Sequence, residues 1–415
     1  MARGLNNSSV SGSALATAML YIITPQTAEA QSEPTRGSVD ISVQYTGDAI
    51  SDVQGGVDQG TSYLHKVEIV LDAAGSIAGV ADLHAFIDAG QVNGVGFSRR
   101  LVGDAQGVSN IEAFRGLDLF QAWVSKAFPA MSATATVGLI DLNSNFDTQN
   151  VGALFMNSSH GVGAELSHSG LTGPSIFPLS SLGGVFEKTI APGPDGASLT
   201  LRLGVFDGIP GDPAAPDHFA VRLGRHDGVL LIGQVERALG PDASIQVGYW
   251  QYTAAQPLTL PTPGGPAIAS GDRGGYVRLE GPLAHFNGDS MVAGWVRAGL
   301  ADARFGSIAN YIGGGAKLSG VLFSGGSDAL GLSVASAGFS RRFRASTGAP
   351  ALPASRETTF ELTYRTPPWR GFAIQPDLQF VQHPGGDLGL PNAIIVGLRL
   401  AFKGSLFAAS TGSGP

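Results

Sequence analysis

The stretch Asn392-Ala-Ile-Ile-Val-Gly-Leu-Arg-Leu-Ala-Phe402 alternates between two kinds of side chain along its whole length. On an extended chain, one face would carry the large apolar residues Ile394, Val396, Leu398, Leu400 and Phe402. The opposite face would carry Ile395, Gly397, Arg399 and Ala401. A period of two residues predicts a β-strand, because successive side chains of a strand point to opposite sides. This strand would have one fully apolar face and one face that bears a charge.

The same alternation recurs along the chain beyond residue 36. Thr358–Thr366, Lys66–Asp72 and Phe219–Leu223 each alternate apolar residues with polar, charged or small ones. A soluble β-sandwich also alternates in this way, so the pattern alone leaves two architectures open. Segments of about ten residues suit tilted membrane strands, and the charges of the second face suit a water-filled lumen. These features favour an all-β, transmembrane antiparallel β-barrel.

The connections between the strands also favour a barrel. Short turns such as Thr366–Gly371 alternate with long Gly- and Pro-rich loops such as Asp141–Ser181 and Thr253–Asp272. Bacterial barrels have short periplasmic turns, long outer loops and an even number of strands. A direct count of the alternating segments gives an odd number. We therefore expect sixteen strands, with one miscounted segment within Asp217–Tyr252.

The first thirty residues have the pattern of a signal peptide. Arg3 is followed by the apolar stretch Ala14–Ile23 and then by Ala28-Glu29-Ala30, a small-x-small cleavage site before Gln31. A membrane anchor is the alternative interpretation. A helix of about ten residues is only about 15 Å long, whereas the hydrocarbon core of a bilayer is about 30 Å thick. We therefore expect residues 1–30 to be a signal peptide.

Composition narrows the class of protein. The chain has 415 residues, of which 43% are hydrophobic and 14% are charged, which is too apolar for disorder and low in charge for a soluble surface. The net charge of −8 argues against binding to nucleic acid, which requires a basic face. The absence of Cys removes disulfides and thiol chemistry. We expect one barrel over residues 31–402 in the bacterial outer membrane, and a loose Gly/Ser-rich tail over residues 403–415.

Several loop motifs resemble those of a known family. They include Val102-Gly-Asp-Ala-Gln-Gly-Val-Ser-Asn-Ile-Glu-Ala113, Gly138-Leu-Ile-Asp-Leu-Asn-Ser-Asn-Phe-Asp147, Asn157-Ser-Ser-His-Gly-Val-Gly163 and Ser169-Gly-Leu-Thr-Gly-Pro-Ser-Ile-Phe-Pro178. Later motifs are Val205-Phe-Asp-Gly-Ile-Pro-Gly-Asp-Pro213, Ile374-Gln-Pro-Asp-Leu-Gln-Phe380 and His383-Pro-Gly-Gly-Asp387. The runs resemble the carbohydrate-selective outer-membrane porin family, the OprB family, from about Tyr45 to Phe402. The resemblance implies a sixteen-stranded barrel whose long outer loops fold into the lumen, and passive uptake of sugars such as glucose.

A sugar pore needs hydrogen-bonding groups and flat apolar surfaces, and it must bind weakly enough for the solute to leave. Candidate hydrogen-bonding residues of the loops are Arg99, Arg100, Asp104, Glu112, Arg115, Asp141, Asn143, Asp147 and Glu165. Candidates on the lumen faces of strands are Arg202, Arg222 and Arg297. Candidate stacking aromatics are Trp123, Trp250 and Trp295. No cofactor or metal ion is expected, and the expected partners are sugars, outer-membrane lipid and lipopolysaccharide.

Each of these candidates also has a purely structural interpretation. A loop Arg–Asp pair can simply hold an inward-folded loop against the barrel wall. A Trp in an outer-membrane strand is commonly a residue of the interfacial girdle. Arg341, Arg342 and Arg344 lie in a long loop and are expected to meet lipopolysaccharide phosphates or solvent rather than the pore.

Other functions are weighed against the porin. Ser158-Ser159-His160 and His168 would be the candidate residues of a hydrolase, but neighbours on an extended chain point apart and no Gly-x-Ser-x-Gly motif is present. The spacing of His160, Glu165 and His168 matches no standard metal site. A general small-solute porin and a non-conducting surface β-protein remain open. Conductance would separate the porins from the surface protein, and block of conductance by sugar would separate the two kinds of porin.

Overall fold

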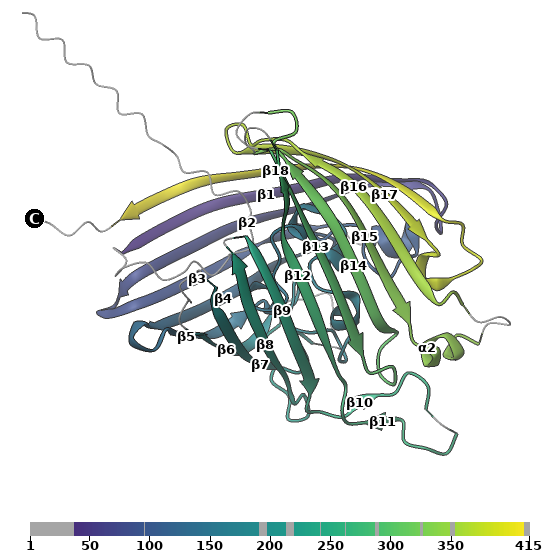
Figure 1. Ribbon diagram of the computed structural model, residues 1–415. Helices are drawn as coiled ribbons and strands as arrows, with labels where there is room; N and C mark the ends of the chain where they lie inside the picture. The colour runs from purple at the N-terminus through teal and green to yellow at the C-terminus, as the bar shows by residue number, and fades with distance from the viewer. Residues whose placement is uncertain are drawn as a thin grey trace, which may run out of the picture.

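The computed structural model describes residues 37–410 except 95, 191–196, 213–219, 241, 262, 287–289, 324–326 and 349–352. Sixteen antiparallel strands close into one barrel (Figure 1), in which each strand pairs with its neighbours in the chain and the first strand pairs with the last. The predicted fold class and strand number are confirmed. The described helices are too short or too polar to cross a membrane. The expected signal peptide, residues 1–30, lies outside the described residues.

The strands of the first half of the barrel are β1 (Ser38–Gln54), β2 (Gly60–Ile77), β3 (Val80–Asn93), β4 (Gly116–Phe128), β5 (Ala133–Ile140), β6 (Ser181–Ile190), β7 (Leu199–Asp207) and β8 (Val229–Gly240). Those of the second half are β9 (Ala243–Tyr252), β12 (Arg273–His285), β13 (Met291–Ala301), β14 (Ile308–Ser319), β15 (Ala329–Phe339), β16 (Arg356–Arg365), β17 (Phe372–Gln382) and β18 (Ala393–Ser410). A separate two-stranded sheet joins β10 (Gln256–Pro257) and β11 (Ile268–Ala269).

The helices are short and lie in the connections. They are α1 (Ala164–Ser167) and α2 (Arg341–Ser346), with single turns at Ser98–Val102, Pro129–Met131, Leu142–Ser144, Gly152–Leu154, Ser158–His160 and Pro384–Gly386. An even number of strands puts both ends of the barrel at the same rim. That rim is periplasmic in bacterial barrels, so the long connections lie at the outer rim.

The alternation in Asn392–Phe402 gives the expected wall. The side chains of Leu398 and Leu400 are 50% and 39% exposed on the outside, whereas Arg399 between them is 9% exposed and faces inward. The inward guanidinium of Arg399 pairs with Asp48 of β1, with 2.7 Å between Nε and Oδ1. Because the apolar side chains line the exterior, the exterior suits lipid and the barrel interior suits polar groups.

Two sequence predictions are wrong. Phe219–Leu223 is not a strand: Ala220–Leu223 lie in the outer connection between β7 and β8, and Phe219 lies outside the described residues. Because β7 pairs directly with β8, this segment has no place in the wall. It accounts for the odd number of alternating segments counted in the sequence. The tail predicted for 403–415 is also wrong over residues 403–410, since β18 runs to Ser410 and pairs with β1 as far as Ser38; residues 411–415 lie outside the described residues.

Candidate functional site

Two outer connections, residues 94–115 and 141–180, fold into the barrel and are called here the inner loops. Phe97, Val108 and Met156 of these loops pack against Ile50 and Ile395 of the wall. A second cluster packs the loop residues Leu142, Phe146, Val162 and Leu166 against the wall residues Ile232, Trp250, Tyr252 and Tyr276. Loop side chains thus fill the outer part of the barrel with an apolar core, as the family resemblance implied.

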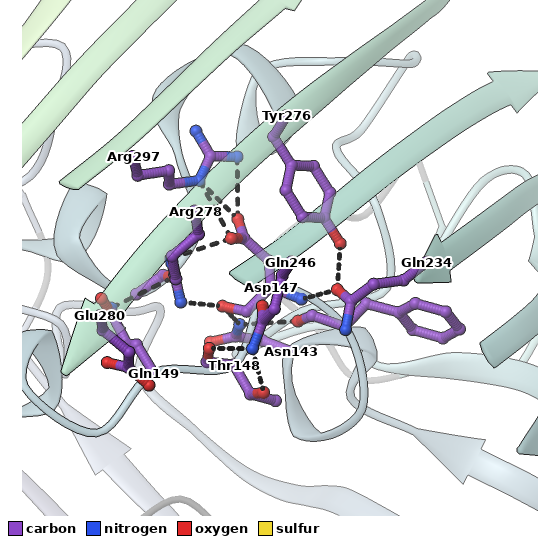
Figure 2. Close-up of polar contacts among 12 residues, drawn as sticks. Asn143, Asp147, Thr148, Gln149, Gln234, Gln246, Tyr276, Arg278, Glu280 and Arg297 are labelled. Carbon is purple, nitrogen blue, oxygen red and sulfur yellow. Dashed lines mark hydrogen bonds and ion pairs between the residues drawn. The ribbon is translucent and has the colours of Figure 1, made fainter. Parts of the chain in front are cut away.

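Asp147 is the centre of the polar contacts that hold the second inner loop (Figure 2). Its carboxylate pairs with Arg297 of β13 at 2.8 Å and with Arg278 of β12 at 2.8 Å. Arg297 also pairs with Glu165 of α1, with 2.7 Å between Nη2 and Oε1. All four side chains are completely buried. Gln234 of β8 completes the site, because its Oε1 accepts hydrogen bonds from the backbone N–H of Asp147 and from the hydroxyl of Tyr276.

Two glycines leave room for these ion pairs. A Cβ atom on Gly163 would lie 1.8 Å from Nη1 of Arg297, and one on Gly299 would lie 1.9 Å from Oε1 of Glu165. Breaking a buried ion pair by removing one partner costs about 3–5 kcal/mol, because the other charge is left uncompensated. Arg297, Asp147 and Glu165 therefore form a structural unit whose burial leaves no surface for contact with a solute.

Wall carboxylates hold the inner loops at three further points. Glu357 of β16 accepts backbone N–H hydrogen bonds from Ala105 and Gln106. Glu361, on the same strand, accepts from the N–H groups of Met156 and Asn157, and Glu280 of β12 from those of Asn150 and Val151. Sequence reasoning missed these anchors. The available signal was the presence of acidic residues on the inward face of strands that follow long loops.

Four other predicted loop residues stabilise turns of the inner loops. Asp141 accepts hydrogen bonds from the N–H groups of Asn143 and Phe177, and Asn143 donates to the carbonyl of Asp147. Asp104 accepts from the N–H of Gly107, and Glu112 accepts from that of Ser98. Burial raises the pKa of Asp141 and of Glu112.

The pKa of Asp104 is raised to about 8. Burial of the carboxyl is the largest cause, and the negative charges of Glu357 and Glu112 add to it. A neutral carboxyl group is therefore favoured where this loop lies against the wall.

The predicted arginines other than Arg297 divide into three groups. Arg99, Arg100 and Arg115 are exposed, the first two on the helical turn that contacts the outer connection between β1 and β2. Arg202 faces inward from β7, between Glu187 of β6 and Glu236 of β8. Arg222 was predicted on a lumen face, which is wrong, because it lies in the outer connection after β7, where it pairs with Asp212 at 2.7 Å.

All three predicted tryptophans lie on inward faces rather than in an outer girdle, but only one keeps accessible surface of any size. Trp250 is completely buried and Trp295 is 5% exposed. Trp123 of β4 is half-buried, stacks on Phe86 of β3 with 5.1 Å between ring centroids, and makes a T-shaped contact with His84 with 5.0 Å between centroids. The Nε2 atom of His84 in turn lies 2.8 Å from a carboxylate oxygen of Asp72.

The Ser–His segment of the second inner loop has structural contacts. The hydroxyl of Ser159 donates to the carbonyl of Gln106, whereas Nε2 of His160 contacts the hydroxyl of Ser333 at 2.9 Å. Burial, with the nearby positive charge of Arg278, lowers the pKa of His160 to about 3, so its imidazole is neutral. His168 contacts the carbonyl of Ala105. These contacts tie the segment to the first inner loop and to β15.

Comparisons with solved structures agree with this architecture. The high-pH structure of Pseudomonas putida OprB matches with a TM-score of 0.76 and 16% identity, over 88% of this chain and 94% of that chain. The low-pH structure of the same protein gives 0.51 and 13%, over 88% and 93%. A triple mutant of the Rh. blastica porin gives 0.50 and 13%, over 88% and 100%. At these identities the likeness establishes the barrel fold.

The sequence comparisons identify the family. No curated protein matches the chain in sequence. The family model described as carbohydrate-selective porin, OprB family, matches residues 58–403, which form most of the chain. This match agrees with the resemblance of the loop motifs. The chain therefore belongs to the OprB family of carbohydrate-selective porins.

Proposed function

We propose that this outer-membrane porin passes neutral sugars through the part of the lumen that the inner loops leave open, along the inward faces of β2, β3 and β4. The observation that carries the proposal is the half-buried Trp123 with Phe86 and His84 beside it. The ring of an aromatic side chain offers a flat apolar surface to the CH face of a sugar. Asp72, paired with His84, adds a hydrogen-bond acceptor at the edge of this aromatic surface.

Charged groups nearby supply donors and acceptors for hydroxyls. Lys66 and Glu68 of β2 pair at 2.6 Å and keep side-chain exposures of 19% and 8%. Arg202 with its two glutamates lies on β6, β7 and β8, further around the wall. Because these charges are already paired, each sugar hydroxyl gains little by replacing water, and binding stays weak enough for release.

The exposed arginines Arg99, Arg100 and Arg115 are retained in the proposal as residues of the outer mouth. Their exposure allows contact with an arriving solute, whereas Arg297 has no accessible surface. Passage of sugar through this lumen needs no catalytic step and no cofactor. The family, the barrel fold and the structural contacts of Ser159 and His160 support this.

The test is single-channel recording in planar bilayers with glucose and maltose. The expected result is a conductance that each sugar reduces reversibly, with a several-fold weaker block in Trp123→Ala, because stacking of a ring on an aromatic is worth about 1 kcal/mol. Trp369→Ala is the matched control, since Trp369 is 70% exposed in the turn between β16 and β17.

Two results would contradict the proposal. Equal sugar block in wild type and Trp123→Ala would remove the aromatic surface from the path. Conductance that no sugar alters, at any accessible concentration, would favour a general small-solute porin.

A further inference from the structure

Arg356 is an arginine of the wall that faces outward, toward lipid, at the outer rim. Arg356 begins β16 and pairs in register with Gly338 of β15, which pairs with Asn310 of β14. At alternate positions along these strands, Ile312, Leu332 and Phe360 are 51%, 61% and 45% exposed on the exterior. Since side chains two residues apart share a face, Arg356 and Asn310 belong to the lipid-facing side. Arg278, Arg297 and Arg399, by contrast, are buried in the barrel interior.

The described contacts of the Arg356 guanidinium are with neutral acceptors. It donates to Oδ1 of Asn310 at 2.7 Å and to the hydroxyl and carbonyl of Ser336, both at 2.9 Å. A Cβ atom on Gly338 would lie 2.4 Å from the Asn310 amide oxygen, so glycine is needed there for this contact. A partly desolvated guanidinium held only by neutral partners is a favourable site for an anion.

Two further arginines converge on the same place. A cavity of about 480 Å³ at the rim is lined by Arg356 together with Arg341 and Arg344 of α2, and among the described residues that line it none is acidic. The helix is fixed above the wall because the hydroxyl of Ser340 caps it and Nε of Arg344 donates to the carbonyl of Pro353 at 2.8 Å. These contacts therefore hold the three guanidinium groups together at one place on the protein surface.

We propose that this cavity binds a phosphate group of a lipopolysaccharide-type lipid in the outer leaflet. Guanidinium groups form charge-assisted, often paired hydrogen bonds with phosphate oxygens. The wall below the cavity continues as an apolar exterior through Leu332, Phe360 and Leu362, and this surface suits the acyl chains of the same lipid. Of the lining residues, Arg356 and Asn310 lie on the outward side of the wall, on β16 and β14, whereas the proposed sugar path follows β2, β3 and β4, so the inference does not depend on that path.

The test measures binding of purified lipid A to the detergent-solubilised barrel. Because each substitution removes charge-assisted hydrogen bonds to the phosphate, Arg341→Gln with Arg344→Gln should weaken binding by about tenfold or more. Adding Arg356→Gln should weaken it further. Arg342→Gln is the matched control, because Arg342 is on the same helix but donates to the carbonyl of Leu260 and does not line the cavity.

The phosphate requirement is tested with two more probes. Dephosphorylated lipid A should bind at least tenfold more weakly than lipid A, and inorganic phosphate alone should bind more weakly still. The proposal is overturned if the α2 double variant binds lipid A as wild type does, if dephosphorylated lipid A binds equally well, or if free phosphate binds as tightly as the lipid. The double variant leaves the wall residue Arg356 in place, which keeps the test independent of barrel assembly.

Sugar block in the same double variant separates this inference from the proposed function. Unchanged conductance and unchanged glucose block are expected, because α2 follows β15, whereas the proposed sugar path follows β2, β3 and β4. Altered glucose block in the double variant, but not in Arg342→Gln, would place these arginines in the solute path and would contradict the lipid assignment.

Discussion

The outer and periplasmic parts of the barrel interior are lined by the same strands, but their inward-facing ion pairs differ in how deeply they are buried. In the outer part, the inner loops cover the wall, and Arg297, Asp147 and Glu165 are completely buried. Toward the periplasm, the side chains of Glu187 and Glu236 beside Arg202 remain 24% and 22% exposed. Inward-facing ion pairs therefore serve two purposes in this protein. Where a loop covers them they stabilise it, and where no loop covers them they remain available to water and solutes.

The comparison is tested most strongly at Arg297. Arg297→Met should destabilise the packed loop by about 3–5 kcal/mol, because Asp147 and Glu165 would lose a buried cationic partner. We expect a lower temperature of the heat-modifiable gel shift and a larger, noisier conductance as the loop loosens. Arg225→Met, at an exposed outer position, is the control. Unchanged thermal stability and conductance in Arg297→Met would show that the ion pairs do not hold the loop.

A change at Arg202 should affect ion selectivity more than stability. Arg202→Gln leaves Glu187 and Glu236 without their shared cation, in a region where water partly screens both carboxylates. We expect a shift of the reversal potential toward cations in a salt gradient, with little change in thermal stability. A large loss of stability together with unaltered selectivity would mean that this part of the wall is as structural as the outer part.

The third comparison is the pH dependence that Asp104 gives to the first inner loop. Its pKa is about 8 in the folded protein, above its ordinary value near 3.8, so its contribution to stability is full below about pH 4 and is lost as pH rises through 8. Asp104→Asn should match wild type at pH 4 and be more stable at pH 9.

Unfolding of the two proteins by heat at both pH values measures this difference. Asp104→Asn also removes a charge that interacts with Glu112 and Glu357, so the comparison reports the group of interacting carboxyls that contains Asp104. A constant difference in stability between pH 4 and pH 9 would contradict the assignment of the raised pKa to this carboxyl.

The sequence predicted the wall better than its contents. Alternation in Asn392–Phe402 is a local property, since each side chain of a strand is fixed to one of two sides. Phe219–Leu223 alternates too, yet it lies in an outer connection, because pairing of β7 with β8 leaves it no neighbour. The last strand was predicted to end too early because Lys403 and Gly404 interrupt the apolar pattern, while hydrogen bonding to β1 extends it to Ser410.

Most of the candidate residues lie in the interior or at its outer mouth, with Arg222 the exception, but the sequence did not predict which groups they contact. Trp123, Trp250 and Trp295 could not be distinguished from the sequence as stacking aromatics. Only Trp123 lies where loop packing leaves it half-buried. Glu357 and Glu361 were not selected as site residues, because their partners are backbone N–H groups about 200 or more residues away in the chain.

By itself, the sequence determined a closed wall with an apolar exterior, an interior that carries charges, and a family that transports carbohydrates. The tertiary structure alone decided which charges lie under a loop and which remain in water. That distinction depends on contacts such as Asp147 with Arg297, which join segments 150 residues apart. Periodicity reports the side of the wall on which a residue lies, whereas long-range packing decides what covers it.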